Sequence, residues 1–479
     1  MVLQAHAVQA LRRLEPVLAP LGARFAAAGR TLHLVGGPVR DALLGRALDD
    51  LDLTTDARPE EVLRLVEGYA ETTWETGIAF GTVGLQHRGM RVEITTWRAD
   101  SYDRVSRNPV VTYGDSLVDD LVRRDFTVNA MAVAVPDWAA PGAFVDPYGG
   151  LDDLAAGVLR TPGTPQDSFG DDPLRMLRAA RFASQLGLRV APEVVAAMTA
   201  MSGSMAMITR ERVKEELAKL LVGAHPRAGL ALLVETGVAD DVLPELPALR
   251  LEIDEHHQHK DVYEHTLQVL ERAVRLEQDG PDLVLRLAAL LHDIGKPRTR
   301  RHEPGGGVSF HHHEVVGAQM ARKRLKALTF GKDVVDAVVL LTELHLRFHG
   351  YGQPGRSAWT DSAVRRYVTD AGDQLERLHK LVRSDCTTRN RRKAAALSAA
   401  YDDLEERIAR LREQEELDRI RPDLSGEQVM ALLGVGPSRT VGLALKHLLA
   451  LRMEHGPLGQ DRAEAELRAW AADQGLELP

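Results

Sequence analysis

Cysteine is nearly absent from this chain, because Cys386 is the single cysteine among 479 residues. One thiol cannot form a disulfide bond within the chain, so a disulfide framework is excluded. This composition fits a reducing cytoplasm, where thiols stay reduced. We therefore expect an intracellular, cytoplasmic protein.

Long hydrophobic runs are missing as well. No uninterrupted apolar segment approaches the length of about 20 residues that a membrane-spanning helix needs. Near the N-terminus, Arg12, Arg13, Glu15 and Arg24 interrupt the apolar segment that a signal peptide would require. We expect a soluble protein with no membrane partner.

An excess of positive charge is also lacking, since the formal net charge is −9. A nucleic-acid partner needs only a local basic surface, however. Residues 175–227 contain nine basic residues against four acidic ones, and residues 322–324 and 391–393 form two further basic clusters. A solvated helix face explains any one of these clusters equally well. Nucleic-acid binding is permitted but not proven.

The length and the uneven composition predict several domains. A chain of 479 residues is too long for one core and should hold roughly three or four domains. Val, Ile and Thr cluster in the first 135 residues, whereas Leu, Ala, Arg and Glu dominate after them. Strand-forming residues thus give way to helix-forming ones. We predict an α/β head followed by an almost entirely helical remainder.

A segment of the head joins a glycine pair to two aspartates on one strand face. An apolar run ends at Gly36 and Gly37, and a helical pattern then carries Arg40. Asp50 and Asp52 alternate with leucines, so they share one face of a strand. Two such carboxylates repel each other unless a divalent cation lies between them. The pattern indicates metal-dependent phosphoryl or nucleotidyl transfer, although a lone D-x-D is more often an acidic edge strand.

A third carboxylate follows on a later strand. Glu93 alternates with Val92 and Ile94, so it lies on the opposite strand face from these two apolar residues. It can complete a metal triad, and an ordinary exposed strand position is the alternative. Residues 97–113 are polar and without a clean period, so we expect a loop over the site.

A polar turn supplies further candidates. Asp125 is placed to cap a helix, and Asn129 projects from the same side one turn later. Arg123 and Arg124 precede this helix, where a triphosphate could bind them.

Several longer motifs, in a consistent order, carry a family resemblance. They are GGPVRDALLGR with DLDLTT, RRDFTVNAMA, DPYGGLDDL and DDPLRMLRAARFA. Together they resemble the bacterial-type (class II) tRNA nucleotidyltransferases and poly(A) polymerases of the polymerase-beta superfamily, over residues 30–225. The resemblance implies an α+β fold. A polymerase-beta-like nucleotidyltransferase head, with a mixed sheet and helices, would precede an all-helical neck, an HD domain and a tail.

The reaction of that family joins the 3′-hydroxyl of an RNA to the α-phosphate of a nucleoside triphosphate and releases pyrophosphate. By resemblance, Asp50 and Asp52, with Glu93 as the third carboxylate, would be catalytic and would bind Mg²⁺ ions. One ion would lower the pKa of the attacking hydroxyl and the other would stabilise the leaving pyrophosphate. The residues that the resemblance assigns to the nucleotide are Gly36, Gly37, Arg40, Arg124, Asp125, Asn129, Asp172, Arg175 and Arg178.

Asp172 and Arg175 have the chemistry to select a base. At spacing i, i+3 they would share one helix face, and Asp only accepts hydrogen bonds whereas Arg only donates them. Cytosine and adenine each present an amino donor beside ring acceptors, which matches this pair. Uracil and guanine reverse that polarity, and each unpaired buried group costs about 1–3 kcal/mol. The pair could therefore choose C and A without a nucleic-acid template.

A purely structural role for this pair stays open. Asp172 stands before Pro173, where it would cap a helix, and Arg175 could be a surface residue. The family usually has Glu-Asp here, whereas this chain has Asp171 before Asp172. Farther on, Glu211 and Arg212 resemble a family motif that braces the base-selecting helix.

The middle of the chain is rich in histidine. The pattern resembles the HD phosphohydrolase superfamily, in which imidazoles and carboxylates on successive helices bind a divalent metal, here of unknown identity. The residues concerned are His265, His292, Asp293, His313, His345 and Asp385. A degenerate domain that binds RNA without hydrolysis is the alternative. We expect His256, His257 and His259 to flank this domain.

These patterns predict four domains. They are a nucleotidyltransferase head (1–155), a helical neck for base selection and RNA binding (156–250), an HD domain (251–392) and a helical tail for tRNA docking (393–479). The predicted enzyme adds or repairs the 3′-terminal CCA of tRNA, using CTP and ATP. Poly(A) polymerase activity, HD phosphohydrolase as the main activity and an RNA-binding pseudo-enzyme stay open. So do CC-only and A-only addition, and the oligomeric state.

Overall fold

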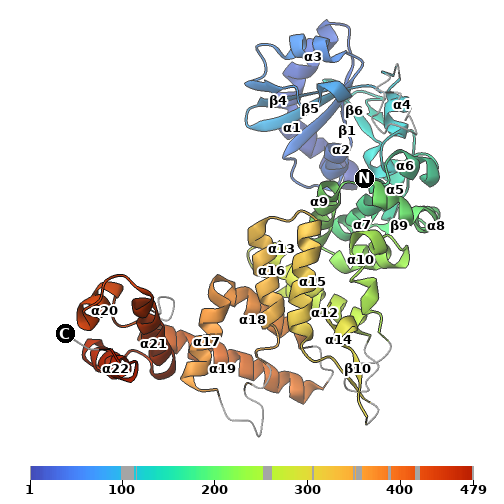
Figure 1. The fold of residues 1–479 in the computed structure, drawn as a ribbon. Helices are drawn as coiled ribbons and strands as arrows, with labels where there is room; N and C mark the ends of the chain where they lie inside the picture. The colour runs from blue at the N-terminus through green and yellow to red at the C-terminus, as the bar shows by residue number, and fades with distance from the viewer. Residues whose placement is uncertain are drawn as a thin grey trace. The chain divides into compact units, whose positions relative to one another are not determined.

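The computed structural model describes residues 2–98, 113–114, 116–251, 261–304, 307–348, 351, 359–386, 390–415 and 421–476 (Figure 1). The chain divides into two compact units, Met1–Pro244 and Glu245–Pro479. Most of the predicted loop 97–113 and all of His256, His257 and His259 lie outside the described residues. In the part of the chain that is described, no helix has both the length and the apolar character needed to cross a membrane. The finer division into four domains remains a prediction.

A seven-stranded mixed sheet forms the centre of the first unit, in the order β3-β4-β5-β2-β1-β6-β7. Strands β2 and β5 are parallel, whereas β2 pairs with β1 in antiparallel fashion. The strands are β1 Leu32–Val35, β2 Asp50–Thr55, β3 Thr72–Trp74, β4 Thr82–His87, β5 Met90–Thr96, β6 Ala132–Val135 and β7 Phe144–Val145.

Alternation along the central strands separates the core from the site. Leu51 and Leu53 on β2, and Val92 and Ile94 on β5, are buried. Because successive side chains of a strand point to opposite faces, the acidic residues between these apolar ones lie on the other face. The predicted mixed sheet is confirmed.

Helix α1 (Val2–Ala27) packs against β1, β6 and two helices of the head with its apolar face. Leu18, Leu21 and Phe25 of α1 are fully buried. Gly22 allows α1 to approach the end of β6 closely, because a Cβ at this position would lie 2.7 Å from the backbone nitrogen of Pro136. The other helices of the head are α2 Gly37–Leu43, α3 Pro59–Val66, η1 Ile78–Phe80, α4 Leu117–Val122, η2 Thr127–Asn129 and α5 Gly150–Ala156.

The helix predicted after Asp125 is wrong in type, because the structure has the single 3₁₀ turn η2 there. Strand β6 begins at Ala132, so the chain has room for only one turn. The carboxylate of Asp125 still accepts a hydrogen bond from the backbone N–H of Phe126, at 2.8 Å. A short turn thus fixes the direction of these polar side chains.

The neck is built around α7 (Leu174–Leu186), which packs against α9 and α10. A Cβ at Gly229 would lie 2.5 Å from the carbonyl oxygen of Ala180, so only glycine permits this close approach of α10 to α7. The neck is not all helical, since β8 Val158–Leu159 and β9 Arg189–Val190 form a small parallel pair. Its other helices are α6 Pro165–Asp171, α8 Pro192–Met201, η3 Ser202–Met207, α9 Arg210–Leu221, α10 Pro226–Glu235 and α11 Ala239–Val242.

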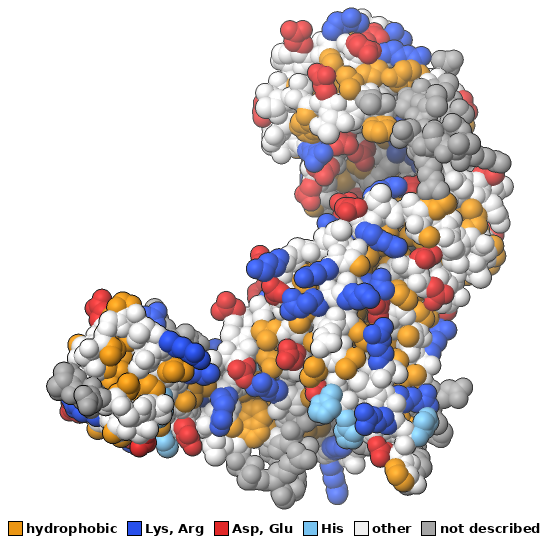
Figure 2. All heavy atoms as spheres, in the orientation of Figure 1, with side chains coloured by type: hydrophobic (Ala, Val, Ile, Leu, Met, Phe, Trp, Pro, Cys, Tyr) orange, Lys and Arg blue, Asp and Glu red, His pale blue; other side chains and the backbone are white. Residues whose placement is uncertain are grey.

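In its described residues, the second unit is helical apart from a short antiparallel pair of β10 (Arg301–His302) and β11 (Val308–Ser309). Helices α12, α13, α16 and α18 pack together. The first part of this unit consists of η4 Pro247–Leu249, α12 Val262–Leu276, α13 Leu283–Leu291, α14 Lys296–Thr299, α15 His313–Ala327, α16 Lys332–Leu344, α17 Asp361–Ala371, η5 Gly372–Gln374 and α18 Leu375–Asp385. Figure 2 shows Lys and Arg side chains over the face where α15 and α16 lie.

The C-terminal helices have an apolar core of their own, formed by residues such as Val429, Leu448 and Leu467. That core joins α20 Gly426–Leu433, α21 Arg439–His455 and α22 Gln460–Asp473, whereas the long helix α19 Arg391–Glu415 packs against α17 and α18.

Candidate active site and metal centre

The two acidic strands of the head place their carboxylates side by side. In the parallel register of β2 and β5, Asp52 lies opposite Glu93 and Asp50 lies opposite Arg91. Burial raises the pKa of Asp52, and the negative charges of Glu93 and Asp50 raise it further, although Arg124 opposes them. A carboxylate that is costly to keep charged gains from a bound cation.

Glu93 is turned toward a neighbour on its own strand. Arg91 Nη2 donates a hydrogen bond of 2.7 Å to Glu93 Oε1, and both side chains are partly exposed. Such an exposed ion pair contributes about 1 kcal/mol at most, so a divalent cation can compete with it. Across the described residues, groups of three or more possible ligands within 4.8 Å of one another occur in the second unit only. The head carboxylates are neighbours without converging on one point.

Gly36 lies between Asp52 of β2 and the guanidinium of Arg124. Its φ of 73° is in the left-handed region that glycine tolerates best. A Cβ there would lie 2.9 Å from Arg124 Nη1 and 4.0 Å from Asp52 Oδ2. The bare backbone at the start of α2 therefore borders both the acidic strand and a cation that can bind phosphate.

Asp120 was missed by the sequence reasoning. Its carboxylate is 0% exposed and accepts hydrogen bonds from Arg123 at 2.6 and 3.0 Å and from Arg124 at 3.2 Å. Burial alone would raise the pKa of Asp120, but Arg124 and Arg123 outweigh it and hold the pKa below its ordinary value. The spacing i, i+3 and i, i+4 between these residues is the signal that could have found it.

A buried chain of polar groups runs from the head into the neck. Arg40 Nη1 donates to Asn129 Oδ1 at 2.6 Å, and Asn129 Nδ2 donates to Asp125 Oδ1 at 2.9 Å. Arg178 donates two hydrogen bonds to Asp125 Oδ2, at 2.6 and 2.9 Å, and its Nη1 lies 3.5 Å from Glu216 Oε1. Burial would raise the pKa of Asp125, but Arg178 and Asn129 hold it well below its usual range. Four of the predicted site residues thus belong to one network.

Glu216 is the second residue that the sequence reasoning missed. It is 4% exposed on α9 and accepts from Arg181 at 3.3 Å as well as from Arg178. Burial lowers the pKa of Arg181 to about 10. The predicted brace Glu211 is exposed instead. An acidic residue on the apolar face of an amphipathic helix is the signal that marks Glu216.

Asp172 caps the start of α7 and is braced from α9. Its Oδ1 accepts a hydrogen bond of 3.1 Å from the backbone N–H of Leu174. Its Oδ2 accepts one of 2.7 Å from Arg212, a residue predicted as a brace. The capping alternative from the sequence is therefore present, and it leaves one side of the carboxylate partly exposed.

Arg175 does not pair with Asp172. Its Nη1 donates to Ser168 Oγ at 2.8 Å, and its Nη2 donates to the carbonyl oxygen of Arg123 at 2.6 Å. Asp172 stands before Pro173 rather than inside α7, so the two residues flank the first turn instead of sharing one helix face.

The second unit gathers all six of the predicted HD residues. His265 lies on α12, and the others lie at the ends of α13, α16 and α18 and at the start of α15. His265 Nε2 is 2.9 Å from Asp385 Oδ1, and His292 Nε2 is 3.2 Å from Asp293 Oδ2. The ligand atoms form two groups, one of His265, His292 and Asp385 and one of Asp293, His313 and His345.

The backbone fixes the orientation of three of these imidazoles. The Nδ1 atoms of His292, His313 and His345 lie 2.6–2.9 Å from the carbonyl oxygens of Ala289, Phe310 and Thr342. Nδ1 therefore carries a proton, and Nε2 faces the cluster, where a metal can take its lone pair. All three Nε2 atoms are buried and have no hydrogen-bond partner among the described residues, although carboxylates lie at ion-pair distance. Buried unpaired acceptors in this arrangement fit a divalent cation.

The pKa values of the cluster also indicate that its carboxylates attract positive charge. Burial lowers the pKa of His345 to about 3. Against the same effect of burial, Asp293 and Asp385 raise the pKa of His292 to about 10. Lys296 Nζ also lies 2.9 Å from Asp293 Oδ2. The carboxylates therefore require positive charge beside them.

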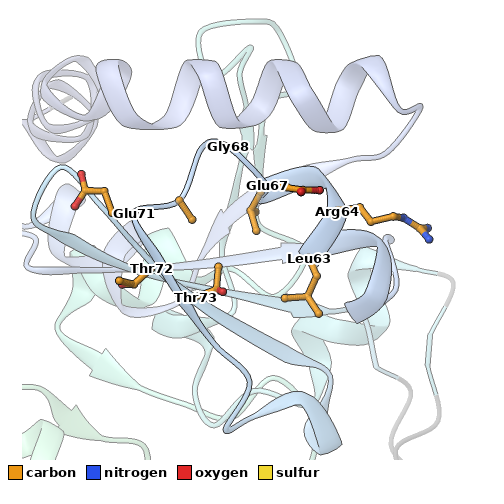
Figure 3. Close-up of a pocket in the computed structure, with 9 residues that line it drawn as sticks. Leu63, Arg64, Glu67, Gly68, Glu71, Thr72 and Thr73 are labelled. Carbon is orange, nitrogen blue, oxygen red and sulfur yellow. The ribbon is translucent and has the colours of Figure 1, made fainter.

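The head also has a shallow pocket away from these sites (Figure 3). It is lined by the C-terminal half of α3, the turn after it and the start of β3. None of the predicted site residues lines it.

The fold and the site define a nucleotidyltransferase with a poly(A) polymerase-type head. Residues 32–160 match the poly A polymerase head domain, and residues 187–249 match the probable RNA and SrmB- binding site of polymerase A. Residues 262–409 match the HD domain. Proteins with such a head use divalent metal ions.

The chain belongs to the tRNA nucleotidyltransferase family. It is 34% identical over 455 residues to the A-adding tRNA nucleotidyltransferase of Deinococcus radiodurans. This alignment covers 93% of this chain and 96% of that protein. It is 42% identical over 212 residues to the CCA-adding enzyme of Levilactobacillus brevis. This second alignment covers 44% of this chain and 51% of that enzyme. The match thus spans about half the length of the latter relative.

A solved structure has the same fold over nearly the whole chain. The CCA-adding enzyme of Bacillus stearothermophilus in complex with CTP is similar with a TM-score of 0.67 at 26% identity. The match covers 95% of this chain and 97% of that one.

Proposed function

We propose that the protein adds or repairs the 3′-terminal CCA of tRNA, using CTP and ATP. The observation that carries this proposal is the parallel register of Asp52 and Glu93 beside Gly36 and Arg124 in the head. Relatives and a solved structure named as CCA-adding enzymes, one of them in complex with CTP, support it.

At the metal edge, Asp50, Asp52 and Glu93 would hold Mg²⁺. The metal would supply a lower pKa for the attacking 3′-hydroxyl and charge stabilisation for pyrophosphate. The backbone of Gly36 and Gly37 would lie along the triphosphate, which the left-handed φ of Gly36 and the start of α2 support.

The arginines beside this edge would neutralise the phosphates. Arg124 is held by the fully buried Asp120, so its charge is kept in place at a small entropic cost when a nucleotide binds. We assign Asp125 and Asn129 to the ribose, and we assign Arg40 and Arg178 to holding that pair in position. The engagement of both Asp125 oxygens within the protein supports a fixed rather than an adaptable ribose site.

Asp172 and Arg175 would select the base. Asp172 offers a partly exposed acceptor and Arg175 a guanidinium donor at the first turn of α7. This polarity matches cytosine and adenine and opposes uracil and guanine.

The second unit would bind a divalent metal through His265, His292, Asp293, His313, His345 and Asp385. Mixed imidazole and carboxylate ligands suit first-row transition metals, and the bound metal would activate water toward a phosphoester. Asp293 would contact the metal group at the centre of the cluster, and the carbonyl-bound imidazoles would stay in one orientation.

The test is nucleotide incorporation by the purified protein. Transcripts of one tRNA that end before CCA, after C and after CC are each incubated with one NTP at a time. We expect CTP to extend the first two and ATP to extend the third, with the reaction ending after CCA. Long tails made from ATP alone would indicate a poly(A) polymerase instead.

A-only addition is the second candidate, because the relative that aligns over 96% of its own length is named A-adding. In the same assay it predicts that ATP extends the CC-ending tRNA while CTP extends no transcript. Phosphohydrolysis as the main activity predicts another result: Asp293→Ala abolishes the activity and Asp52→Ala leaves it intact.

A further inference from the structure

The guanidinium of Arg175 is anchored by a serine of the preceding helix. Ser168 lies on α6 and is 7% exposed. Its hydroxyl accepts from Arg175 Nη1 at 2.8 Å, and its carbonyl oxygen accepts from the same nitrogen at 3.3 Å. That carbonyl oxygen also accepts from the backbone N–H of Asp172, at 3.2 Å, so it is shared. The hydroxyl is therefore the shorter and less divided of the two acceptors.

The second anchor of Arg175 is the backbone of the head. The carbonyl oxygen of Arg123 accepts from Arg175 Nη2 at 2.6 Å. Arg123 is held in turn by two hydrogen bonds to the fully buried Asp120. One end of the guanidinium is thus tied to a rigid part of the head, and the orientation of its plane depends on the other end.

The anchoring leaves donors for a base. A guanidinium has five N–H groups, and the contacts with Ser168 and Arg123 use three of them. Two N–H groups remain, which is the number that the O2 and N3 acceptors of cytosine require. Where these two point is decided by the plane of the guanidinium.

Among the described residues, the hydroxyl of Ser168 makes no hydrogen bond within its own helix α6. Thr164 caps α6 by accepting from the backbone N–H of Asp167. Ser168 lies in the next turn, where alanine is the residue that helices favour most. A serine that is buried at this position is used for its contact with Arg175.

We propose that Ser168 is a positioning residue that sets the orientation of Arg175 and thereby the preference for C and A over U and G. The proposal rests on the function proposed above and names a determinant of its specificity. The mechanism is preorganisation: the hydroxyl holds the guanidinium in the plane that accepts the correct bases before the nucleotide arrives.

The test compares Ser168→Ala with the unchanged full chain. The kcat/KM of each of the four NTPs is measured on the tRNA end that the unchanged protein extends. A hydrogen bond to a charged group is lost, so we expect discrimination against UTP and GTP to fall about tenfold. Ser168→Thr keeps the hydroxyl and should restore the discrimination. The ratio of kcat/KM values is taken on one preparation, so the folded fraction cancels from it.

Ser184→Ala is the matched control. Ser184 lies on α7, is fully buried and donates to the carbonyl oxygen of Leu220 at 2.6 Å, away from Arg175. Its loss should lower the melting temperature and leave the discrimination ratio unchanged. A fall of the ratio in Ser168→Ala alone supports positioning, and equal ratios in all variants overturn it. If the unchanged protein extends no tRNA with CTP or ATP, the proposed function fails instead.

Discussion

The two sites of this protein are built in opposite ways. In the second unit, the six candidate ligands form two compact groups, and backbone carbonyls fix three of their imidazoles, whose Nε2 atoms are buried. In the head, Asp52 and Glu93 are neighbours on parallel strands, but Glu93 pairs with Arg91 and Asp50 is exposed. The proposed metal ligands of the second unit are thus already close together, whereas a bound ligand would still have to draw the carboxylates of the head together.

The difference matches what we propose that each site binds. A metal that stays bound gains from a closed shell of fixed ligands, because little ordering is left to do. A nucleotide that arrives and leaves with its metal needs open carboxylates and arginines that are already in position. In the first unit, the arginines are therefore the residues held in fixed positions, by hydrogen bonds to Asp120, Asp125 and Glu216.

The largest effect should come from breaking the metal edge of the head. Asp52→Asn removes the charge of the carboxylate that has Glu93 opposite it, so nucleotide incorporation should fall by at least about 10³-fold. The measurement is single-turnover incorporation of the accepted NTP. Asp49→Asn, an exposed residue just before β2, is the control and should stay within twofold (about the error of such assays). Equal loss in both variants would contradict the assignment.

The next effect concerns the arginine side of the head. Asp120→Asn leaves Arg123 and Arg124 without their buried counter-charge, so the free energy of unfolding of the first unit should fall by about 3 kcal/mol. Urea denaturation measures it. Asp119→Asn changes an exposed acid on the same helix and should cost less than about 0.5 kcal/mol. Similar costs for both would mean that the arginines are not held by Asp120.

Metal removal should distinguish the second unit from the head. EDTA should lower the free energy of unfolding of the second unit by about 2–3 kcal/mol, because a metal at about 100 times its Kd stabilises the folded state by that amount. Asp293→Ala should abolish both the bound metal, measured by elemental analysis, and this response to EDTA. Incorporation by the head should continue at the normal rate when Mg²⁺ is supplied. A variant that keeps its metal would refute the role of Asp293.

The smallest effect is a pH dependence of the head. The pKa values of Asp120 and Asp125 are held below the ordinary value by arginines and Asn129. A carboxyl with a lowered folded pKa stabilises above its unfolded pKa of about 4, and this contribution is lost as the pH falls through the folded pKa. The stability difference between the unchanged protein and Asp120→Asn should therefore be constant from pH 7 to 5 and shrink below pH 4. Denaturant titrations at each pH test it, and a difference that grows in acid would show the wrong sign.

Much of the fold could be predicted from local patterns. The alternation of Asp50 and Asp52 with Leu51 and Leu53 is a property of the strand itself, and the structure has the leucines buried. The sequence predicts a helix after Asp125, because a capping aspartate precedes a 3₁₀ turn as it precedes an α-helix. Only the nearby start of β6 limits this segment to one turn.

The contacts among the site residues were harder to predict, since they join distant segments. Nothing in the local pattern of Glu216 says that it faces Arg178 and Arg181 of α7. The partners of Arg175 are likewise absent from its own helix, since they come from α6 and from the backbone of the head.

The sequence by itself determined which kinds of residue are present and how they are spaced: a glycine pair, acidic residues on strands, an Asp and an Arg that we assign to a base, and a set of imidazoles and carboxylates typical of HD domains. It could do so because residue type and spacing are local properties. The tertiary structure alone decided that Glu93 lies opposite Asp52, that Asp120 holds Arg124 and that Ser168 orients Arg175. These are contacts whose energy depends on burial and on exact partners, which exist only once the segments have packed together.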